Sequence, residues 1–387
     1  DNSFDLSPSR AITLGPGGGT LNLSTNNTTI SQVISGPGAL VKQGSTGVLT
    51  LSGANTYSGG ITVAEGTITL ANSSAAGAGL IMMEGDGINY ADGVNIANNL
   101  ALDSSATLHV ASGAATHSGL IVNQRSGLSV TKTGVGDLTL KGGGLFGFDA
   151  SVDEGSLIID GNAFFHQDAN TLTVGAATFS LTNGGQFVTG ETQTNINAGG
   201  TLNIGPSSTF RPRGNLVFID ADATVDDGLL NAKPANADFR QPGDAAPSLT
   251  FNSNGGNFLV DNGGSVDFQG GRGGNGTEIL AGIAEQGSIG GAGGSYAIQD
   301  GGVVVRNSST TSLAGGRGGN GAPGADFSGS PNSDAVGGRG GNGGNGGTLT
   351  LSGGSLSIES SAVLSLAGGQ GGAGGTGGDY TGPAPMP

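Results

Sequence analysis

Residues 61–70 read Ile-Thr-Val-Ala-Glu-Gly-Thr-Ile-Thr-Leu, and this stretch indicates how the chain folds. Apolar residues alternate with threonine on both sides of Glu65-Gly66. Alternation with a period of two places the apolar side chains on one face of an extended strand and the threonines on the other. Each half therefore predicts a short β-strand with one buried face, and Glu65-Gly66 predicts the turn between the two strands.

Runs of the same kind recur along the chain at a spacing of roughly ten residues. They include residues 19–23, 48–51, 107–110, 171–174, 201–204, 348–351 and 355–358. The breaks between them are single glycines or Gly-Gly pairs, which are too short to hold a crossover helix. This spacing is compatible with a β-sandwich or a barrel as well as with a solenoid of stacked coils.

Internal repetition favours the solenoid. The segment from Gly38 to Glu65 recurs 89 residues later, from Gly127 to Glu154, with Leu-Thr-Leu preserved at 49–51 and 138–140. Self-similarity of this kind is the signature of stacked repeats. Strands of neighbouring coils then pair in parallel around a narrow core of small aliphatic side chains. We therefore predict an all-β fold, a parallel β-solenoid.

The composition excludes several other classes. Of the 387 residues, 81 are glycine, 11% are charged and 35% are hydrophobic. The charged fraction is too low for long helices or coiled coils, and the hydrophobic fraction exceeds what most disordered chains carry. The glycines lack the strict triplet period of collagen. The sequence contains no run of 18 apolar residues, so it predicts no membrane-spanning helix.

The charge balance and the absence of cysteine limit the partners. Lys and Arg number 13 against 29 Asp and Glu, a formal net charge of -16. The chain therefore lacks the basic surface that nucleic-acid binding needs, and we expect no nucleic-acid partner. A chain without cysteine has no disulfides or thiolate metal sites, and it is compatible with secretion through an oxidising compartment.

Residues 36–44 read Gly-Pro-Gly-Ala-Leu-Val-Lys-Gln-Gly, and residues 47–63 read Gly-Val-Leu-Thr-Leu-Ser-Gly-Ala-Asn-Thr-Tyr-Ser-Gly-Gly-Ile-Thr-Val, with Glu65-Gly66 following. This stretch closely resembles the autotransporter-associated β-strand repeat, which marks the passengers of many large secreted bacterial proteins. The second copy, residues 127–159, lacks the Asn-Thr-Tyr-Ser-Gly-Gly segment and matches less closely. The resemblance implies a right-handed parallel β-helix, export and a surface location. It implies no chemistry, because these repeats are scaffold.

Five glycine-rich runs with a period of three interrupt the strand pattern in the last third, at residues 270–276, 287–294, 315–321, 337–347 and 368–378. A period of three suits polyglycine-II helices, in which every third residue lies on one edge and the bare glycine edges pack side by side. Flexible linkers are the alternative. The third residues of the triplets are our candidate interaction residues: Arg272, Asn275, Arg317, Asn320, Arg339, Asn342 and Asn345.

The stretch 205–247 differs from its surroundings because it carries five of the 13 prolines. Proline cannot donate into a central ladder, so we expect this stretch to leave the solenoid. It would separate coils with autotransporter-type repeats (1–204) from coils with glycine-rich loops (248–387). Such an excursion either contacts a receptor or another subunit or covers the side of the solenoid. Its candidate contacts are Phe210, Arg211 and Arg213.

No motif predicts a catalytic, cofactor-binding or metal-binding residue, and we expect no cofactor. The three histidines lie in unrelated contexts, and no Walker, Gly-x-Ser-x-Gly or His-x-x-His pattern is present. One carboxylate cluster fits a solvated turn, the acid pair of a glycosidase or a calcium loop. Its members are Asp220, Asp222, Asp226 and Asp227. A β-helical polysaccharide-degrading enzyme is therefore the alternative to a non-enzymatic protein.

Together these observations predict a secreted, non-enzymatic structural protein of a bacterial surface. Two versions stay open: a rigid adhesin passenger that meets a cell-surface or glycan receptor, and the subunit of a self-assembling fibre or sheath. The open strand edges at the two ends of a solenoid invite another chain unless they are capped, and neither end of the sequence shows a clear capping helix. The alternative is that the chain is a fragment whose neighbouring coils are missing.

Overall fold

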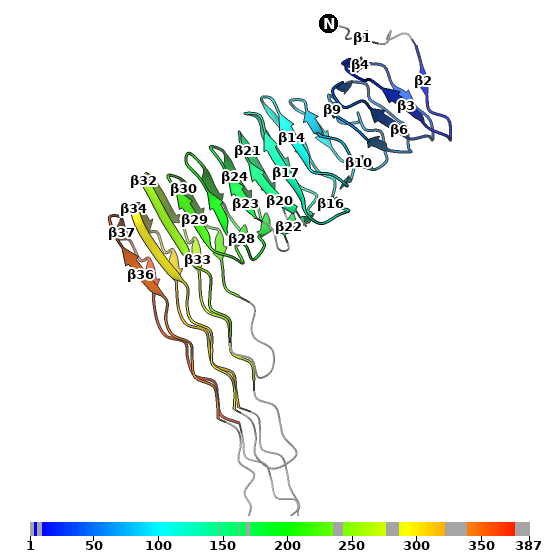
Figure 1. Ribbon diagram of the computed structural model, residues 1–387. Coiled ribbons are helices and arrows are strands. Elements are labelled where there is room, and N and C mark those ends of the chain that lie inside the picture. The colour runs from blue at the N-terminus through cyan, green and yellow to red at the C-terminus, as the bar shows by residue number, and fades with distance from the viewer. Residues whose placement is uncertain are drawn as a thin grey trace, which may run out of the picture. The chain divides into compact units, whose positions relative to one another are not determined.

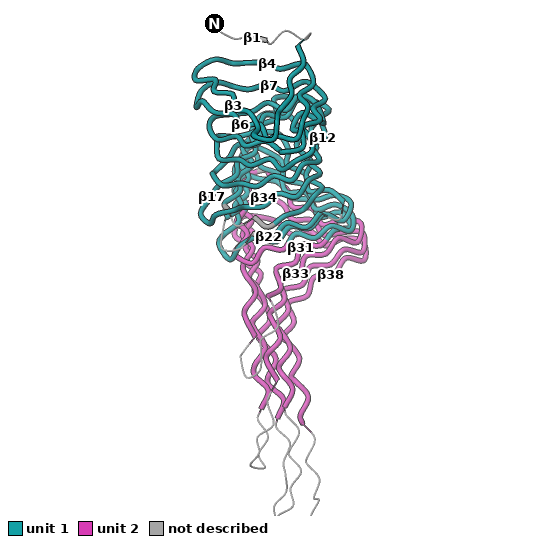
Figure 2. The backbone as a smooth tube through the Cα atoms, turned by 90° about the vertical axis from the view of Figure 1, so that its right-hand side faces the viewer, with its two compact units in different colours: residues 1–210, 218–228 teal, residues 211–217, 229–387 magenta. Residues whose placement is uncertain are grey.

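The computed structural model (Figure 1) describes residues 4–5, 10–146, 148–161, 163–167, 171–234, 243–275, 286–321 and 339–375. All the regular elements within these residues are β-strands, which confirms the all-β prediction. None of these residues forms a helix of the length and apolar character that crossing a membrane requires. The chain divides into two compact units, shown in Figure 2: unit 1 comprises residues 1–210 and 218–228, and unit 2 comprises residues 211–217 and 229–387.

Unit 1 is built from short strands of two to six residues. They are β1 (Phe4–Asp5), β2 (Ile12–Thr13), β3 (Gly19–Asn22), β4 (Thr28–Ile30), β5 (Ile34–Ser35), β6 (Leu40–Gln43), β7 (Leu49–Leu51), β8 (Ile61–Val63), β9 (Thr67–Leu70), β10 (Ile81–Met83), β11 (Gly87–Tyr90), β12 (Asn95–Ile96), β13 (Leu100–Leu102), β14 (Ala106–Val110), β15 (Ala114–His117), β16 (Ile121–Asn123), β17 (Leu128–Thr133), β18 (Asp137–Leu140), β19 (Gly144–Phe146), β20 (Phe148–Val152), β21 (Ser156–Asp160), β22 (Phe164–Gln167), β23 (Leu172–Val174), β24 (Thr178–Thr182), β25 (Gln186–Val188), β26 (Thr194–Ile196), β27 (Thr201–Ile204) and β30 (Asp222–Asp226). The boundary between the units falls within β28 (Thr209–Arg211) and β29 (Leu216–Ile219).

From β10 onward, each coil of unit 1 adds one strand to each of three parallel columns (Figure 1). The first column runs β10, β13, β16, β19, β22 and β25, and the second runs β11, β14, β17, β20, β23 and β26. The third column runs β12, β15, β18, β21, β24, β27 and β30. Strands with the same place in successive coils therefore pair, which is the predicted parallel solenoid. Its right-handed sense stays a prediction, supported by the usual hand of parallel crossovers.

The inward positions of the columns carry aliphatic side chains that stack from coil to coil. In the second column Ile68, Ile88 and Leu108 follow one another in register, each at most 2% exposed. The residues that alternate with these along each strand face outward. Two of them are linked across adjacent strands, since Asn89 Nδ2 donates to Thr69 Oγ1 at 3.2 Å. Strands such as β9 and β14 thus have one buried and one partly exposed face, as their alternation predicts.

Further along unit 1 the core becomes aromatic, which the low aromatic content did not lead us to expect. The rings of Phe165, Phe179, Phe187 and Phe210 form a cluster with centroid separations of 5.0 to 6.5 Å. All four are at most 2% exposed. Edge-to-face and offset ring contacts of this kind add to the free energy of burial.

Unit 2 repeats the architecture with fewer strands, of which β32 and β34 are long. They are β31 (Leu229–Asn231), β32 (Leu249–Asp261), β33 (Ser265–Asp267), β34 (Ser295–Val305), β35 (Thr310–Ser312), β36 (Thr348–Leu351), β37 (Ser355–Ile358) and β38 (Val363–Ser365). β31, β33, β35 and β38 form one parallel column. β32 pairs with β34, which in turn pairs with both β36 and β37.

The expected excursion at 205–247 is wrong for residues 205–234. This stretch contains β28, β29, β30 and β31, and β30 pairs in parallel with β27 as the columns require. Pro206 and Pro212 lie between strands and not inside them. Because a coil turns a corner every few residues, proline finds a place there without breaking a ladder. Residues 235–242 lie outside the described residues.

Candidate interaction surface

In unit 2, glycine-rich segments leave the strands and return to them side by side, as the magenta tubes of Figure 2 show. We call residues 268–275, 313–321 and 366–375 the outgoing segments, because they follow β33, β35 and β38. We call residues 243–247, 286–294 and 339–347 the returning segments, because they lead into β32, β34 and β36. The parts of the predicted runs at 276, 337–338 and 376–378 lie outside the described residues.

Backbone hydrogen bonds link each segment to two kinds of neighbour. Outgoing and returning segments that are adjacent in the chain run antiparallel: Gly316 N donates to Gly291 O at 2.7 Å, and Gly344 N donates to Gly316 O at 2.8 Å. Segments of the same kind run parallel: Gly315 N donates to Ala367 O at 2.9 Å, and Gly290 N donates to Asn342 O at 2.9 Å. The segments therefore form a two-row bundle, which we call the glycine bundle, and its described parts are ordered by backbone contacts.

Glycine is required in this bundle because the backbones touch. A Cβ atom at Gly316 would lie 2.0 Å from Gly271 O, and one at Gly319 would lie 1.8 Å from Gly274 O. None of the glycines of the described bundle has a positive φ, so the requirement is for space and not for an unusual backbone conformation. In residues 315–320 both glycines of each triplet lie against neighbouring segments, whereas in residues 368–373 only Gly369 and Gly372 do.

The third position carries the candidate interaction residues, and the structure places them unevenly. Four are exposed: Arg317, Arg339, Asn342 and Asn345. The other three are partly buried, and they are Arg272, Asn275 and Asn320. Whether any of the seven contacts a partner stays a prediction.

The side chains of Asn275 and Asn320 each accept a hydrogen bond from the backbone of the next outgoing segment. Asn275 Oδ1 accepts a hydrogen bond from Asn320 N at 2.9 Å, and Asn320 Oδ1 accepts one from Ala373 N at 3.1 Å. Arg272 Nη2 donates to the same Asn275 oxygen at 3.0 Å. The asparagine side chain thus supplies an acceptor for the N–H of the third-position residue in the next outgoing segment.

The candidate contacts of the expected excursion do not form one surface. Phe210 is fully buried in the aromatic cluster of unit 1, so its assignment as a surface contact is wrong. Arg211 Nη2 donates to the carbonyl oxygen of Lys233 at 3.1 Å in unit 2. Arg213 is exposed. In Thr209–Arg211 the apolar Phe210 lies between two polar residues, and it takes the inward position of the strand. This alternation was the signal in the sequence that Phe210 is buried.

Sequence reasoning missed two buried lysines, one in each repeat copy. Lys42 Nζ donates to the carbonyl oxygens of Gly44 and Glu65 at 2.6 and 2.7 Å, and Glu65 Oε2 accepts from Gly44 N. Lys132 Nζ donates to Gly134 O at 2.8 Å and Glu154 O at 3.1 Å, although its strand lies in another sheet. Each ammonium group thus satisfies corner carbonyls of two coils.

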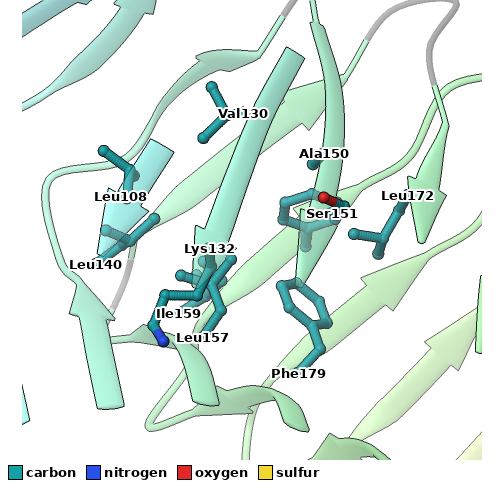
Figure 3. Close-up of a pocket in the computed structure, with 11 residues that line it drawn as sticks. Leu108, Val130, Lys132, Leu140, Ala150, Ser151, Leu157, Ile159, Leu172 and Phe179 are labelled. Atoms are coloured by element: carbon teal, nitrogen blue, oxygen red, sulfur yellow. The ribbon is translucent and has the colours of Figure 1, made fainter. Parts of the chain in front are cut away.

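Lys132 reaches those carbonyls through the apolar core of unit 1, among Leu157 and Ile159, as Figure 3 shows. The cavity beside it measures about 20 Å³, which leaves room for little more than one water molecule. At this volume the cavity is a packing defect and not a ligand site. Burial lowers the pKa of Lys132 to about 8 and also lowers the pKa of Lys42.

The carboxylate cluster lies on and beside β30. Asp220 and Asp227 occupy turn positions with φ of 50° and 49°, on either side of β30. Across the described part of the chain, no group of three or more His, Cys, Asp or Glu side chains could hold a metal ion.

Comparison with known proteins agrees with the repeat. A family model described as the passenger-associated-transport-repeat matches residues 40–70, which run from β6 to β9. The chain is also similar to the adhesin BmaC autotransporter of Brucella suis biovar 1 (strain 1330), with 30% identity over 243 residues. That similarity covers 61% of this chain and 6% of the Brucella protein. No solved structure matches significantly.

Proposed function

We propose that this chain is part of a secreted passenger of the autotransporter type, exposed at a bacterial surface, where it acts as a non-enzymatic adhesin scaffold. The observation that carries the proposal is the parallel solenoid around the matched repeat, together with the similarity to an adhesin autotransporter. A solenoid of this kind gains stability from each added coil and so makes a rigid spacer.

The contact with a receptor belongs to the glycine bundle in this proposal. We infer that its segments are polyglycine-II helices, because in residues 315–320 the two glycines of each triplet donate to different neighbouring segments, while the third position, as at Arg317, is exposed. This arrangement presents Arg317, Arg339, Asn342 and Asn345 on backbone that is held in place. Rigid display lowers the entropy lost on binding. Guanidinium and amide groups suit a receptor rich in hydroxyl and carboxylate oxygens, such as an acidic glycan.

Cell binding by the purified chain tests the proposal. We expect the quadruple variant Arg317→Ala, Arg339→Ala, Asn342→Ala, Asn345→Ala to lose most of its binding to cultured cells and to immobilised acidic glycans. Its melting temperature should stay unchanged, because these side chains are exposed. The matched control is Arg125→Ala, Lys141→Ala, which also removes two positive charges, from exposed side chains of unit 1 that pair with Asp103 and Asp160.

Two results would contradict the proposal. The first is quadruple-variant binding equal to that of the unsubstituted chain, which would exclude the glycine bundle as the receptor contact. The second is turnover of a polysaccharide that disappears in Asp222→Asn or Asp226→Asn, which would establish an enzyme.

A further inference from the structure

The outward face of unit 1 carries a polar hollow where β9, β11 and β14 lie side by side. It is open to solvent and has a volume of about 310 Å³. Six residues line it: Thr67, Asp86, Gly87, Asn89, Thr107 and His109. Ligand sites in proteins begin at about this size. Every side chain that lines the hollow is polar, so the hollow suits a ligand that forms hydrogen bonds.

The hollow exists because glycine interrupts a row of outward threonines. Thr67, Gly87 and Thr107 are in register on adjacent strands, so the glycine leaves a gap between two hydroxyl groups. A Cβ atom at Gly87 would lie 2.3 Å from Thr107 O. No side chain can therefore fill the gap, and the backbone itself forms the floor of the hollow.

The two threonines beside the gap have hydroxyl groups that the fold does not use. Further along the same row, outward side chains bond to one another across strands, as where Ser151 Oγ donates to Thr131 Oγ1 at 3.1 Å. Among the described residues, neither Thr67 nor Thr107 has such a partner for its hydroxyl. Both side chains are partly exposed. Their hydroxyl groups are therefore free to bind a ligand.

Three further side chains place acceptors and donors around these hydroxyl groups. Asn89 Nδ2 donates to Thr69, which leaves Asn89 Oδ1 as an acceptor. His109 Nδ1 bonds to Thr133 Oγ1 at 3.0 Å, which leaves the other ring nitrogen for a ligand. The carboxylate of Asp86 is exposed and accepts. A ligand with several hydroxyl groups satisfies this mixture, because each hydroxyl both donates and accepts.

Charge selects among the hydroxyl-rich ligands. Asp86 brings a negative charge to the hollow, and no lysine or arginine lines it. The whole chain has a formal net charge of -16, so an acidic sugar would be repelled. A bound metal ion is not supported either, because the described residues hold no group of three or more His, Cys, Asp or Glu that could bind one. The ligand chemistry that fits is a neutral sugar.

We propose that this hollow binds a neutral hexopyranose unit of a glycan. The sugar lies over Gly87, and its hydroxyl groups bond to those of Thr67 and Thr107. The row of outward hydroxyl groups continues through Thr131 and Ser151, which gives the next units of a glycan polar contacts on the following coils. The proposal goes beyond the receptor contact at the glycine bundle, because it concerns another unit of the chain and a ligand of different charge.

Nuclear magnetic resonance of the full chain with carbon-13-labelled histidine tests the proposal. The probes are the methyl glycosides of glucose, mannose and galactose and linear tetrasaccharides of the same sugars. We expect at least one glycoside to shift the ring signals of His109, with a dissociation constant on the order of 1 mM. Its tetrasaccharide should shift the same signals and bind more tightly. The ring signals of His117, which is fully buried, should stay unchanged.

Thr67→Val, Thr107→Val removes both hydroxyl groups and keeps the branched shape of the side chains. This variant should raise the dissociation constant about tenfold or more, with an unchanged melting temperature. The matched control is Thr50→Val, Thr173→Val, which alters two partly exposed threonines of the same sheet away from the hollow. The control should bind the sugar as the unsubstituted chain does.

The proposal is overturned if none of these probes shifts the His109 signals, or if the Thr67→Val, Thr107→Val variant binds normally. Tighter binding of methyl glucuronide than of every neutral glycoside would contradict the neutral ligand, and a tetrasaccharide that binds no more tightly would contradict the glycan. The quadruple variant of the glycine bundle should bind the neutral sugar unchanged. Loss of neutral-sugar binding in that variant would place the sugar at the bundle and not in the hollow.

Discussion

The coils of unit 1 and the glycine bundle of unit 2 hold polypeptide together in opposite ways. In the coils, side chains fill the interior, and stacked residues such as Ile88 and Leu108 are buried to within 2% of their surface. In the bundle no side chain fits between the segments, and the backbones bond directly to one another. The coils are therefore stabilised by the volume of their side chains, and the bundle by the absence of side chains between its segments. Removing side-chain atoms should destabilise the coils, and adding a methyl group should destabilise the bundle.

The largest effect is expected from removing volume in the aromatic cluster. Phe187→Ala deletes a ring that lies 5.0 Å from the Phe179 ring and 6.2 Å from the Phe210 ring. We expect unit 1 to lose about 3 to 5 kcal/mol in free energy of unfolding, because the rigid coils collapse only partly into the space. Urea unfolding measures the loss. Phe164→Ala, at an exposed position, is the control, and equal losses for both variants would argue against the cluster.

Acidification should act on the coils through His117. This side chain is fully buried, continues the ladder of Ile96 and Leu140, and accepts or donates a hydrogen bond with Tyr90 Oη at 3.1 Å. Burial lowers its pKa to about 4. Between pH 6.5 and pH 4 the unfolded chain takes up a proton at His117 and the folded chain does not, so stability falls as the pH falls.

The loss from His117 should approach about 3 kcal/mol by pH 4. His117→Leu should remove this part of the pH dependence, and His109→Ala, at a partly exposed position, should leave it in place. Thermal unfolding followed by circular dichroism between pH 7 and pH 4 makes the comparison. Parallel pH profiles for the unsubstituted chain and His117→Leu would exclude this histidine as the cause.

Adding volume to the glycine bundle should have a smaller but definite effect. Gly318→Ala places a methyl group 2.0 Å from Gly341 O, so the segments must separate. We expect a loss of about 1 to 3 kcal/mol, as for other overpacked sites, visible as faster amide exchange along residues 315–321 and 339–347. Unchanged protection in these segments would mean that the bundle is looser than its hydrogen bonds indicate.

The smallest effect should come from the asparagine side chains. Asn320→Ala removes the acceptor of the N–H of the exposed Ala373, a contact of 3.1 Å. We expect the local free energy of opening to fall by about 0.5 to 1.5 kcal/mol. The effect should appear as faster exchange of the Ala373 amide and of no other amide. Asn342→Ala, on a returning segment, is the control and should leave that amide unaffected. An Asn320→Ala variant with normal protection of the Ala373 amide would show that the asparagine side chains add nothing to the stability of the glycine bundle.

Much of the strand pattern could be read from the chain, because alternation depends only on neighbouring residues. The run at 67–70 became β9, and the glycine triplets became segments with two contacting faces. The buried lysines and His117 escaped this reading, because an inward polar residue looks like an ordinary irregularity until its partners on other coils are known. The prolines at 206 and 212 misled us for a related reason: proline excludes a strand interior, and a solenoid has corners where it fits.

The order of residues by itself determined where strands and glycine triplets begin, since both follow from periods of two and three. Only the stacked coils decided which glycines have a neighbour and which inward side chains stay uncovered. Gly318 and Gly371 occupy the same place in the same kind of triplet, yet a methyl group is excluded at one and accommodated at the other. Steric exclusion depends on backbone brought close from another coil, and the local sequence carries no record of that distance.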